Sequence, residues 1–120
     1  MREVKFRAFD KSRDDMFTRD FFVDISGRAY EIIDSSYCGH DVIKFNDDLV
    51  LMQFTEIRDC DGIEIYFGDI VKIYGYGNLH VDSLGDLMIL VDALAENDIG
   101  EILGNIYENK DLIEANKWNN

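Results

Sequence analysis

The residues best suited to chemistry are two cysteines and two histidines, and their spacing limits what they can do. Cys38 and His40 are separated by one glycine, so together they could supply two ligands to a metal ion. Cys60 and His80 lie far along the chain, and nothing near either pair completes a set of four ligands. A cysteine beside a histidine could also act as a nucleophile, but the sequence does not bring the two together. We therefore expect no metal site, no cofactor and no catalytic set built on these residues.

Asp69 is a further polar candidate, because it follows Gly68 between two apolar runs. A catalytic carboxylate needs a second acid or base, and none has an identifiable relation to Asp69. The structural interpretation is simpler: glycine permits a turn, the aspartate accepts backbone N–H groups, and the following residues enter the core. The segment 75–78 (GYGN) resembles a phosphate loop, but it lacks the lysine and the following helix, which favours a hairpin loop. We expect that the protein is not an enzyme.

The charge of the chain excludes several partners. The net charge is −13, and the sequence pI is about 4.3. Residues 1–50 carry 11 acidic and 8 basic residues, whereas residues 51–120 carry 14 acidic and 4 basic residues. Such a surface repels phosphate backbones and anionic membranes, so we expect no direct nucleic-acid binding and no membrane binding. Two interpretations stay open: charge that serves solubility, or an acidic face that docks on a basic partner.

The sequence predicts short secondary-structure elements, most of them β-strands. Alternating apolar residues predict strands over residues 2–9 and 29–33, with a hairpin turn signal at Ser26-Gly27 before the second. The apolar run at residues 87–91 has the length of a strand buried on both faces, and we predict it as a strand. Residues 110–115 are expected to form a short C-terminal helix capped by Asn109. No apolar run reaches the roughly 20 residues that a membrane helix needs.

Turn signals at intervals of about ten residues predict a mostly β protein rather than an alternating α/β fold. The length of 120 residues fits one domain or two small subdomains. The natural division lies near residue 60, where the charge balance changes. We expect a β-rich N-terminal subdomain over residues 1–60 and a second subdomain over residues 61–120.

Three patches carry a resemblance along nearly the whole chain. They are residues 2–11 (REVKFRAFDK) with Met16; Gln53-Phe54-Thr55 with Asp59, Gly62, Glu64-Ile65-Tyr66 and Gly68-Asp69-Ile70-Val71; and residues 104–109 (GNIYEN) with Leu112. In their order and spacing the chain resembles the YopX-like family of phage and prophage proteins. It departs from the family at Glu56, where glycine is usual, at Phe67, where glutamate is usual, and at Lys110, where proline is frequent.

The resemblance implies an SH3-like barrel in residues 61–120, with the N-terminal part packed on it. It also implies a phage or prophage origin and a cytoplasmic location in a bacterial host, which fits two widely spaced cysteines. It implies no known activity.

Candidate binding residues come from the aromatic and acidic side chains. Exposed aromatic residues of an SH3-like barrel can form a protein-binding groove, and Phe67 replaces a charged residue at a turn. The acidic residues of the last third could form a docking face for a basic partner. The predicted binding set is Phe67, Tyr74, Tyr76, Asp82, Asp86 and Asp92.

These observations lead to two hypotheses of function. The first is a non-catalytic accessory protein that acts through contact with an unknown protein partner, with self-association to a homo-oligomer as one form of such contact. The alternative is an inhibitor whose acidic face imitates nucleic acid and blocks a nucleic-acid-binding or defence protein of the host. Salt separates the two, because charge pairs are screened whereas apolar contacts are not.

Overall fold

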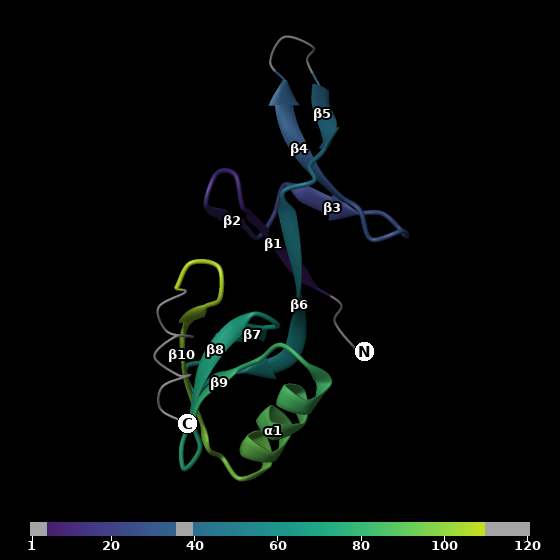
Figure 1. Cartoon of the computed structure of the whole chain (residues 1–120). Helices are drawn as coiled ribbons and strands as arrows, with labels where there is room; N and C mark the ends of the chain where they lie inside the picture. Colours follow the sequence, from purple (N-terminus) through teal and green to yellow (C-terminus); the bar gives the residue numbers. More distant parts are fainter. Residues whose placement is uncertain (1–4, 36–39, 110–120) are drawn as a thin grey trace. The chain divides into compact units, whose positions relative to one another are not determined.

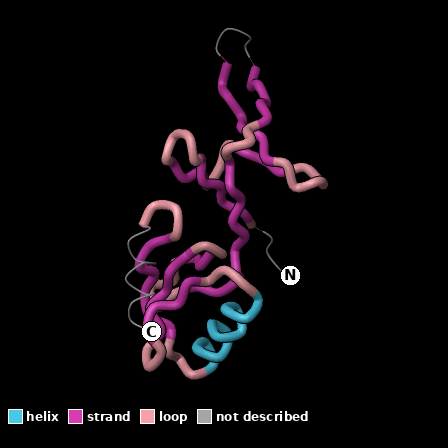
Figure 2. The backbone as a smooth tube through the Cα atoms, in the orientation of Figure 1, coloured by secondary structure: helices cyan, strands magenta, loops and turns pink. Residues whose placement is uncertain are grey.

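The computed structural model describes residues 5–35 and 40–109. Within these ranges the protein is mostly β, as predicted, and one helix interrupts the strands (Figures 1 and 2). The elements are β1 (Phe6–Asp10), β2 (Asp15–Phe17), β3 (Phe21–Val23), β4 (Ala29–Ser35), β5 (His40–Phe45), β6 (Leu49–Arg58), β7 (Glu64–Tyr66), β8 (Asp69–Ile73), β9 (Gly77–His80), α1 (Leu84–Ala95) and β10 (Ile99–Asn105).

The chain forms two compact units. The N-terminal unit comprises Phe6–Met52, and the C-terminal unit comprises Met1–Lys5 with Gln53–Asn120. Strand β6 begins in the first unit and ends in the second, and it belongs to a sheet of order β2-β1-β6-β7. The N-terminal unit adds a sheet of order β3-β4-β5, and the C-terminal unit adds a sheet of order β10-β8-β9.

The predicted turn at Gly27 joins β3 to β4, and both pairs of this sheet are antiparallel. Three aromatic rings gather across its strands: Phe22 stacks on Tyr30 at 4.9 Å, and Phe45 meets Tyr30 edge-on at 5.7 Å. The turn is fixed by Asp24, whose carboxylate accepts bonds from both the N–H and the hydroxyl of Ser26 and from the Tyr30 hydroxyl. These bonds lower the pKa of Asp24 to about 2, the hydrogen bond from the Ser26 side chain being the largest cause.

A buried carboxylate organises the start of the N-terminal unit. Asp10 is fully buried, and its Oδ1 accepts bonds from the Ser12 N–H, the Ser12 hydroxyl and the Arg13 N–H. Its Oδ2 accepts from Asn46, which also donates to Glu31. Burial favours the neutral form, but these bonds outweigh it and leave the pKa of Asp10 below its usual value.

The core of the C-terminal unit is larger and apolar. One cluster gathers buried side chains from strands β6 to β10, from the residue after β9 and from α1. Its members are Ile57, Ile65, Val71, Ile73, Leu79, Val81, Leu90, Ala93 and Ile99. In strand β8, the side chains of Ile70, Val71 and Ile73 are buried. The sequence predicted that the residues after Gly68-Asp69 enter the core. Burial of such side chains contributes on the order of 1.5–3 kcal/mol each.

The strand predicted at residues 87–91 is wrong, because these residues lie inside α1. The helix begins at a capping box: the Ser83 hydroxyl accepts from the Asp86 N–H, and the Asp86 carboxylate accepts from the Ser83 N–H. Leu90 and Ala93, three residues apart, form its buried side. The continuous apolar run therefore arises because both faces of the helix are apolar, and not because a strand is buried on both faces.

A bulge interrupts the pairing of β6 with β7, where the register shifts between Phe54 and Arg58. Glu56 lies in the bulge with φ +72°, in the left-handed region that glycine adopts most easily. The buried Thr55 hydroxyl spans the interruption, because it donates to the Ile65 carbonyl and accepts from the Ile57 N–H. The predicted C-terminal helix at residues 110–115 and the Cys38 side chain lie outside the described residues.

Candidate functional site

The second sequence patch, which runs from Gln53 to Val71, contains two carboxylates that hold the backbone in place. The Asp69 carboxylate is buried and accepts from the Tyr66 N–H at 2.8 Å, which closes the turn between β7 and β8. The Asp59 carboxylate accepts from Asp61, Ile63 and Ile102 N–H groups, and so fastens the loop after β6 to strand β10. These polar residues satisfy backbone donors inside the fold, and this accounts for them without any catalytic role.

The GNIYEN patch has the same character. The Asn105 side-chain oxygen accepts from the Tyr107 and Glu108 N–H groups, and the Asn109 side chain accepts from the Asn105 N–H. A Cβ built on Gly104 would collide with the Asn109 side chain, so only glycine leaves room for this turn. The patch therefore closes the end of β10.

The candidate nucleophiles and metal ligands do not form a site in the described part of the chain. Cys60 is exposed, and its pKa is raised by loss of hydration and by the carboxylates of Asp61, Asp59 and Glu101. A raised pKa leaves less of the reactive thiolate. Among the residues that the structure describes, no three His, Cys, Asp or Glu side chains lie together as metal ligands would.

The predicted aromatic residues fall into two places. Phe67 is half-buried and packs against the core cluster of the C-terminal unit. The sequence had suggested an exposed contact at this turn. Tyr74 and Tyr76 are exposed in the turn between β8 and β9, and Lys72 Nζ lies 5.3 Å from the centre of the Tyr74 ring. Their rings are thus available at the surface, whereas the Phe67 ring supports the fold.

The predicted acidic residues gather around α1. Asp86 is the capping carboxylate, which accepts from the N–H groups of Asp82 and Ser83. Burial raises its pKa, but the bonds from Ser83 outweigh this effect and leave the pKa below its usual value. Asp82 and Asp92 are exposed, the first just before the helix and the second within it.

The main surface feature is an apolar stripe on the outer side of α1, which the sequence prediction missed. Exposure is 73% for Leu84, 64% for Met88 and 48% for Val91, and Leu94 beside them is 53% exposed. Leu84, Met88 and Val91 are separated by four and three residues, and therefore lie along one face of the helix. The signal was present in this spacing and in the capping pair Ser83 and Asp86 at the start of the helix, but it was obscured once residues 87–91 were assigned to a strand.

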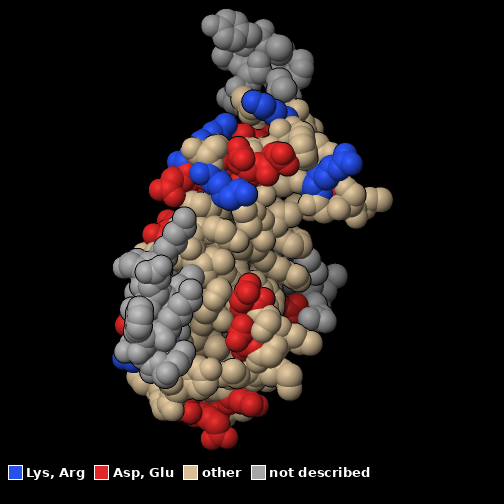
Figure 3. Space-filling view, viewed as in Figure 1, with Lys and Arg blue, Asp and Glu red and all other residues tan. Residues whose placement is uncertain are grey.

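Acidic groups lie near both ends of this α1 stripe. Asp82 lies at its beginning, and Asp92, Glu96 and Asp98 lie along or beyond its last turns. The last turn of the helix carries no basic residue, and the chain contains no lysine or arginine between Lys72 and Lys110. Figure 3 shows acidic side chains near both ends of the helix with uncharged surface between them. The α1 stripe is therefore an apolar surface with negatively charged side chains near its ends.

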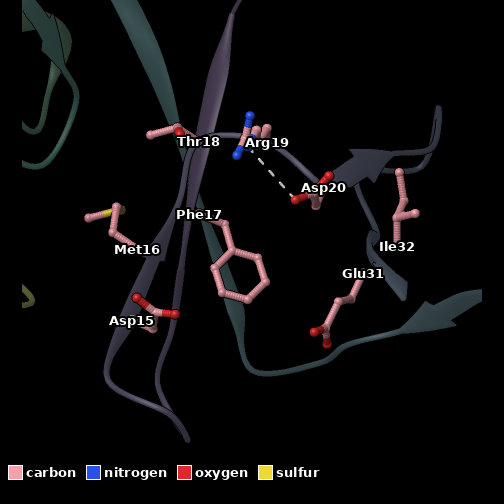
Figure 4. A pocket seen from close by; sticks show the side chains of 8 residues that line it. All are labelled: Asp15, Met16, Phe17, Thr18, Arg19, Asp20, Glu31 and Ile32. Carbon is pink, nitrogen blue, oxygen red and sulfur yellow. Dashed lines mark ion pairs between the residues drawn. The ribbon is translucent and has the colours of Figure 1, made fainter. Parts of the chain in front are cut away.

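The N-terminal unit contains a cavity of about 350 Å³, shown in Figure 4. Four of its eight lining residues are charged, namely Asp15, Arg19, Asp20 and Glu31, with Arg19 and Asp20 forming a 3.9 Å ion pair. Glu31 is already paired with Arg13 and bonded by Asn46. Ligand pockets are mostly apolar with few polar groups, so this polar cavity is a weaker candidate than the α1 stripe.

The comparisons with known proteins agree with the sequence patches. The sequence matches the family described as YopX protein over residues 5–114. The comparison with curated proteins found no match. The crystal structure of protein EF1440 from Enterococcus faecalis is similar in fold, with a TM-score of 0.52 and 23% identity, over 93% of this chain and 99% of that chain. None of the described helices is long and apolar enough to cross a membrane. Because the family match spans most of its length, the chain belongs to the YopX protein family.

Proposed function

We propose that the protein is a non-catalytic protein-interaction module that docks through the α1 stripe. The observation that carries the proposal is the exposure of Leu84, Met88 and Val91 side by side on one helix face. A large apolar side chain exposed alone is ordinary, but a contiguous row on a helix is typical of a surface that another protein covers. The polar residues of the family patches are occupied by backbone groups, which further supports a role without catalysis.

We also infer the finer fold and the cellular setting. The described part of residues 61–120 belongs to an SH3-like barrel, and the antiparallel order β10-β8-β9 and the register shifts in β10 support this, since bulges help sheets to curl. The resemblance to phage and prophage proteins supports an accessory role in the cytoplasm of a bacterial host.

A site-specific cross-link tests the function directly. A photo-reactive amino acid at position 88, introduced in bacterial cells that express the full chain, should give a covalent adduct with another polypeptide. The matched control places the same group at Ile63, which is also exposed in the C-terminal unit but lies outside the stripe. Adducts at position 88 that vanish with Val91→Asp support the proposal. Equal adducts at both positions, or none at position 88, contradict it.

A second candidate is the acidic inhibitor of a nucleic-acid-binding protein. It is favoured by the lack of basic residues between Lys72 and Lys110 together with the exposed Asp82 and Asp92. A partner held in this way should be released as salt rises from about 0.1 M to about 1 M, because the screening length falls from about 10 Å to about 3 Å. Nucleic acid should compete for the same partner. A complex that resists both salt and nucleic acid would speak against mimicry.

A further inference from the structure

The spacing of the α1 stripe defines what shape of partner fits it. Leu84, Met88, Val91 and Ala95 follow at intervals of four, three and four residues. This is the pattern of the apolar seam between packed helices, in which side chains of one helix insert between those of the other. The helix has 12 residues and rises about 1.5 Å per residue, so the seam is three turns long.

The charge around the stripe defines the chemistry of the partner. Asp82, Asp92, Glu96 and Asp98 are acidic side chains near its two ends, and the negative end of the helix dipole adds to them because its last turn carries no cation. A helix that packs on the stripe would place its flanking residues next to these carboxylates. Lysine or arginine there would complement them, whereas acidic flanks would be repelled.

The same charge argues against a second copy as the occupant. Two α1 stripes packed on one another would bring the acidic residues at their ends close together in either direction, in a chain whose net charge is −13. An anionic membrane surface is repelled for the same reason. We propose that the α1 stripe binds a basic amphipathic helix of another protein, with its apolar side on Leu84, Met88 and Val91 and its cationic flanks beside these acidic residues. This proposal rests on the interaction function proposed above and specifies the partner.

The test uses the full chain and two synthetic peptides of about 18 residues, long enough to cover the three turns of α1. Both peptides carry leucines at alternating intervals of three and four, one with lysine on the flanks and the other with glutamate. Fluorescence anisotropy should give micromolar binding of the lysine peptide, since a seam this short buries less than the roughly 800 Å² per partner of a stable interface. The glutamate peptide should not bind.

Two sets of variants identify the surface. Met88→Ser should weaken the lysine peptide about tenfold, because a central apolar contact is lost, whereas Ile63→Ser should leave binding unchanged. Asp92→Asn combined with Glu96→Gln should weaken binding and flatten its salt dependence. Circular dichroism of each variant confirms that the exposed substitutions leave the fold intact.

The outcomes separate this inference from the proposed function. Equal binding of the lysine peptide to the protein and to Met88→Ser would overturn the inference, because contact would then depend on charge alone. A dimer in sedimentation velocity that Met88→Ser dissociates would also overturn it, since a second copy would occupy the stripe. If position 88 forms partner adducts in cells while neither peptide binds, the interaction function stands and the basic helix is excluded.

Discussion

Glu56 has a backbone conformation that glycine adopts more easily than other residues do. Its φ of +72° costs an L-residue about 1–2 kcal/mol, while glycine would lose about 0.5–1 kcal/mol through the entropy of the unfolded chain. We therefore predict that Glu56→Gly is more stable than Glu56→Ala by about 1 kcal/mol in urea unfolding. Both variants lose the glutamate side chain, so their difference isolates the backbone term. Equal stability would mean that the bulge carries no such strain.

Asp24 is the carboxylate whose titration should report the turn between β3 and β4. Its pKa is about 2 in the folded chain against 3.8 for the free group, so its bonds stabilise the fold above about pH 4, and this stabilisation is lost as the pH falls toward 2. A carbon-detected NMR titration of the side-chain carboxyl should therefore show a midpoint near 2. Ser26→Ala should raise the midpoint, because the largest contribution comes from the Ser26 hydroxyl. A midpoint that is unchanged in this variant would contradict the assignment.

At the scale of elements, the capping box decides where α1 begins. Ser83→Ala removes the oxygen that accepts the Asp86 N–H and should lower the free energy of unfolding by about 1 kcal/mol. Ser83→Asn serves as the control, because asparagine caps a helix about as well as serine does. Urea unfolding followed by circular dichroism measures both variants. Should the alanine variant match the wild type, the cap would contribute nothing to stability.

The prediction from sequence succeeded where one local pattern decides the structure. The Ser26-Gly27 turn and the Gly68-Asp69 turn follow from residue types that fit few conformations, and both are confirmed. It failed at residues 87–91, because an apolar run without alternation fits a buried strand and a helix equally well. The capping residues Ser83 and Asp86, just before the run, were the signal that distinguishes a helix from a strand. The stripe was missed because part of the helix was assigned to a buried strand. The sequence also does not show which face of a helix the core covers.

At the scale of the whole molecule, the two units differ in what holds them. The C-terminal unit buries a cluster of nine apolar residues, whereas a described cluster of the N-terminal unit contains Ala8, Ala29 and Leu49 with three partly buried neighbours. The N-terminal unit also contains the buried Asp10, whose carboxylate accepts hydrogen bonds from Ser12 and Asn46. Because apolar burial is the dominant favourable term in folding, the N-terminal unit should open at a lower free energy.

Native-state hydrogen exchange measures this difference strand by strand. We expect amides of β3 and β4 to exchange with a lower opening free energy than those of β8 and β10, which pair around the larger core. Asp10→Asn should widen the gap by about 2 kcal/mol, because its amide nitrogen would face the donor of Asn46 and leave buried groups unpaired. The amides of β8 and β10 should keep their protection in this variant. Uniform protection, or an equal loss in both units, would mean that the chain unfolds as one cooperative body, and the helix-bearing unit would then depend on Asp10 as much as its neighbour does.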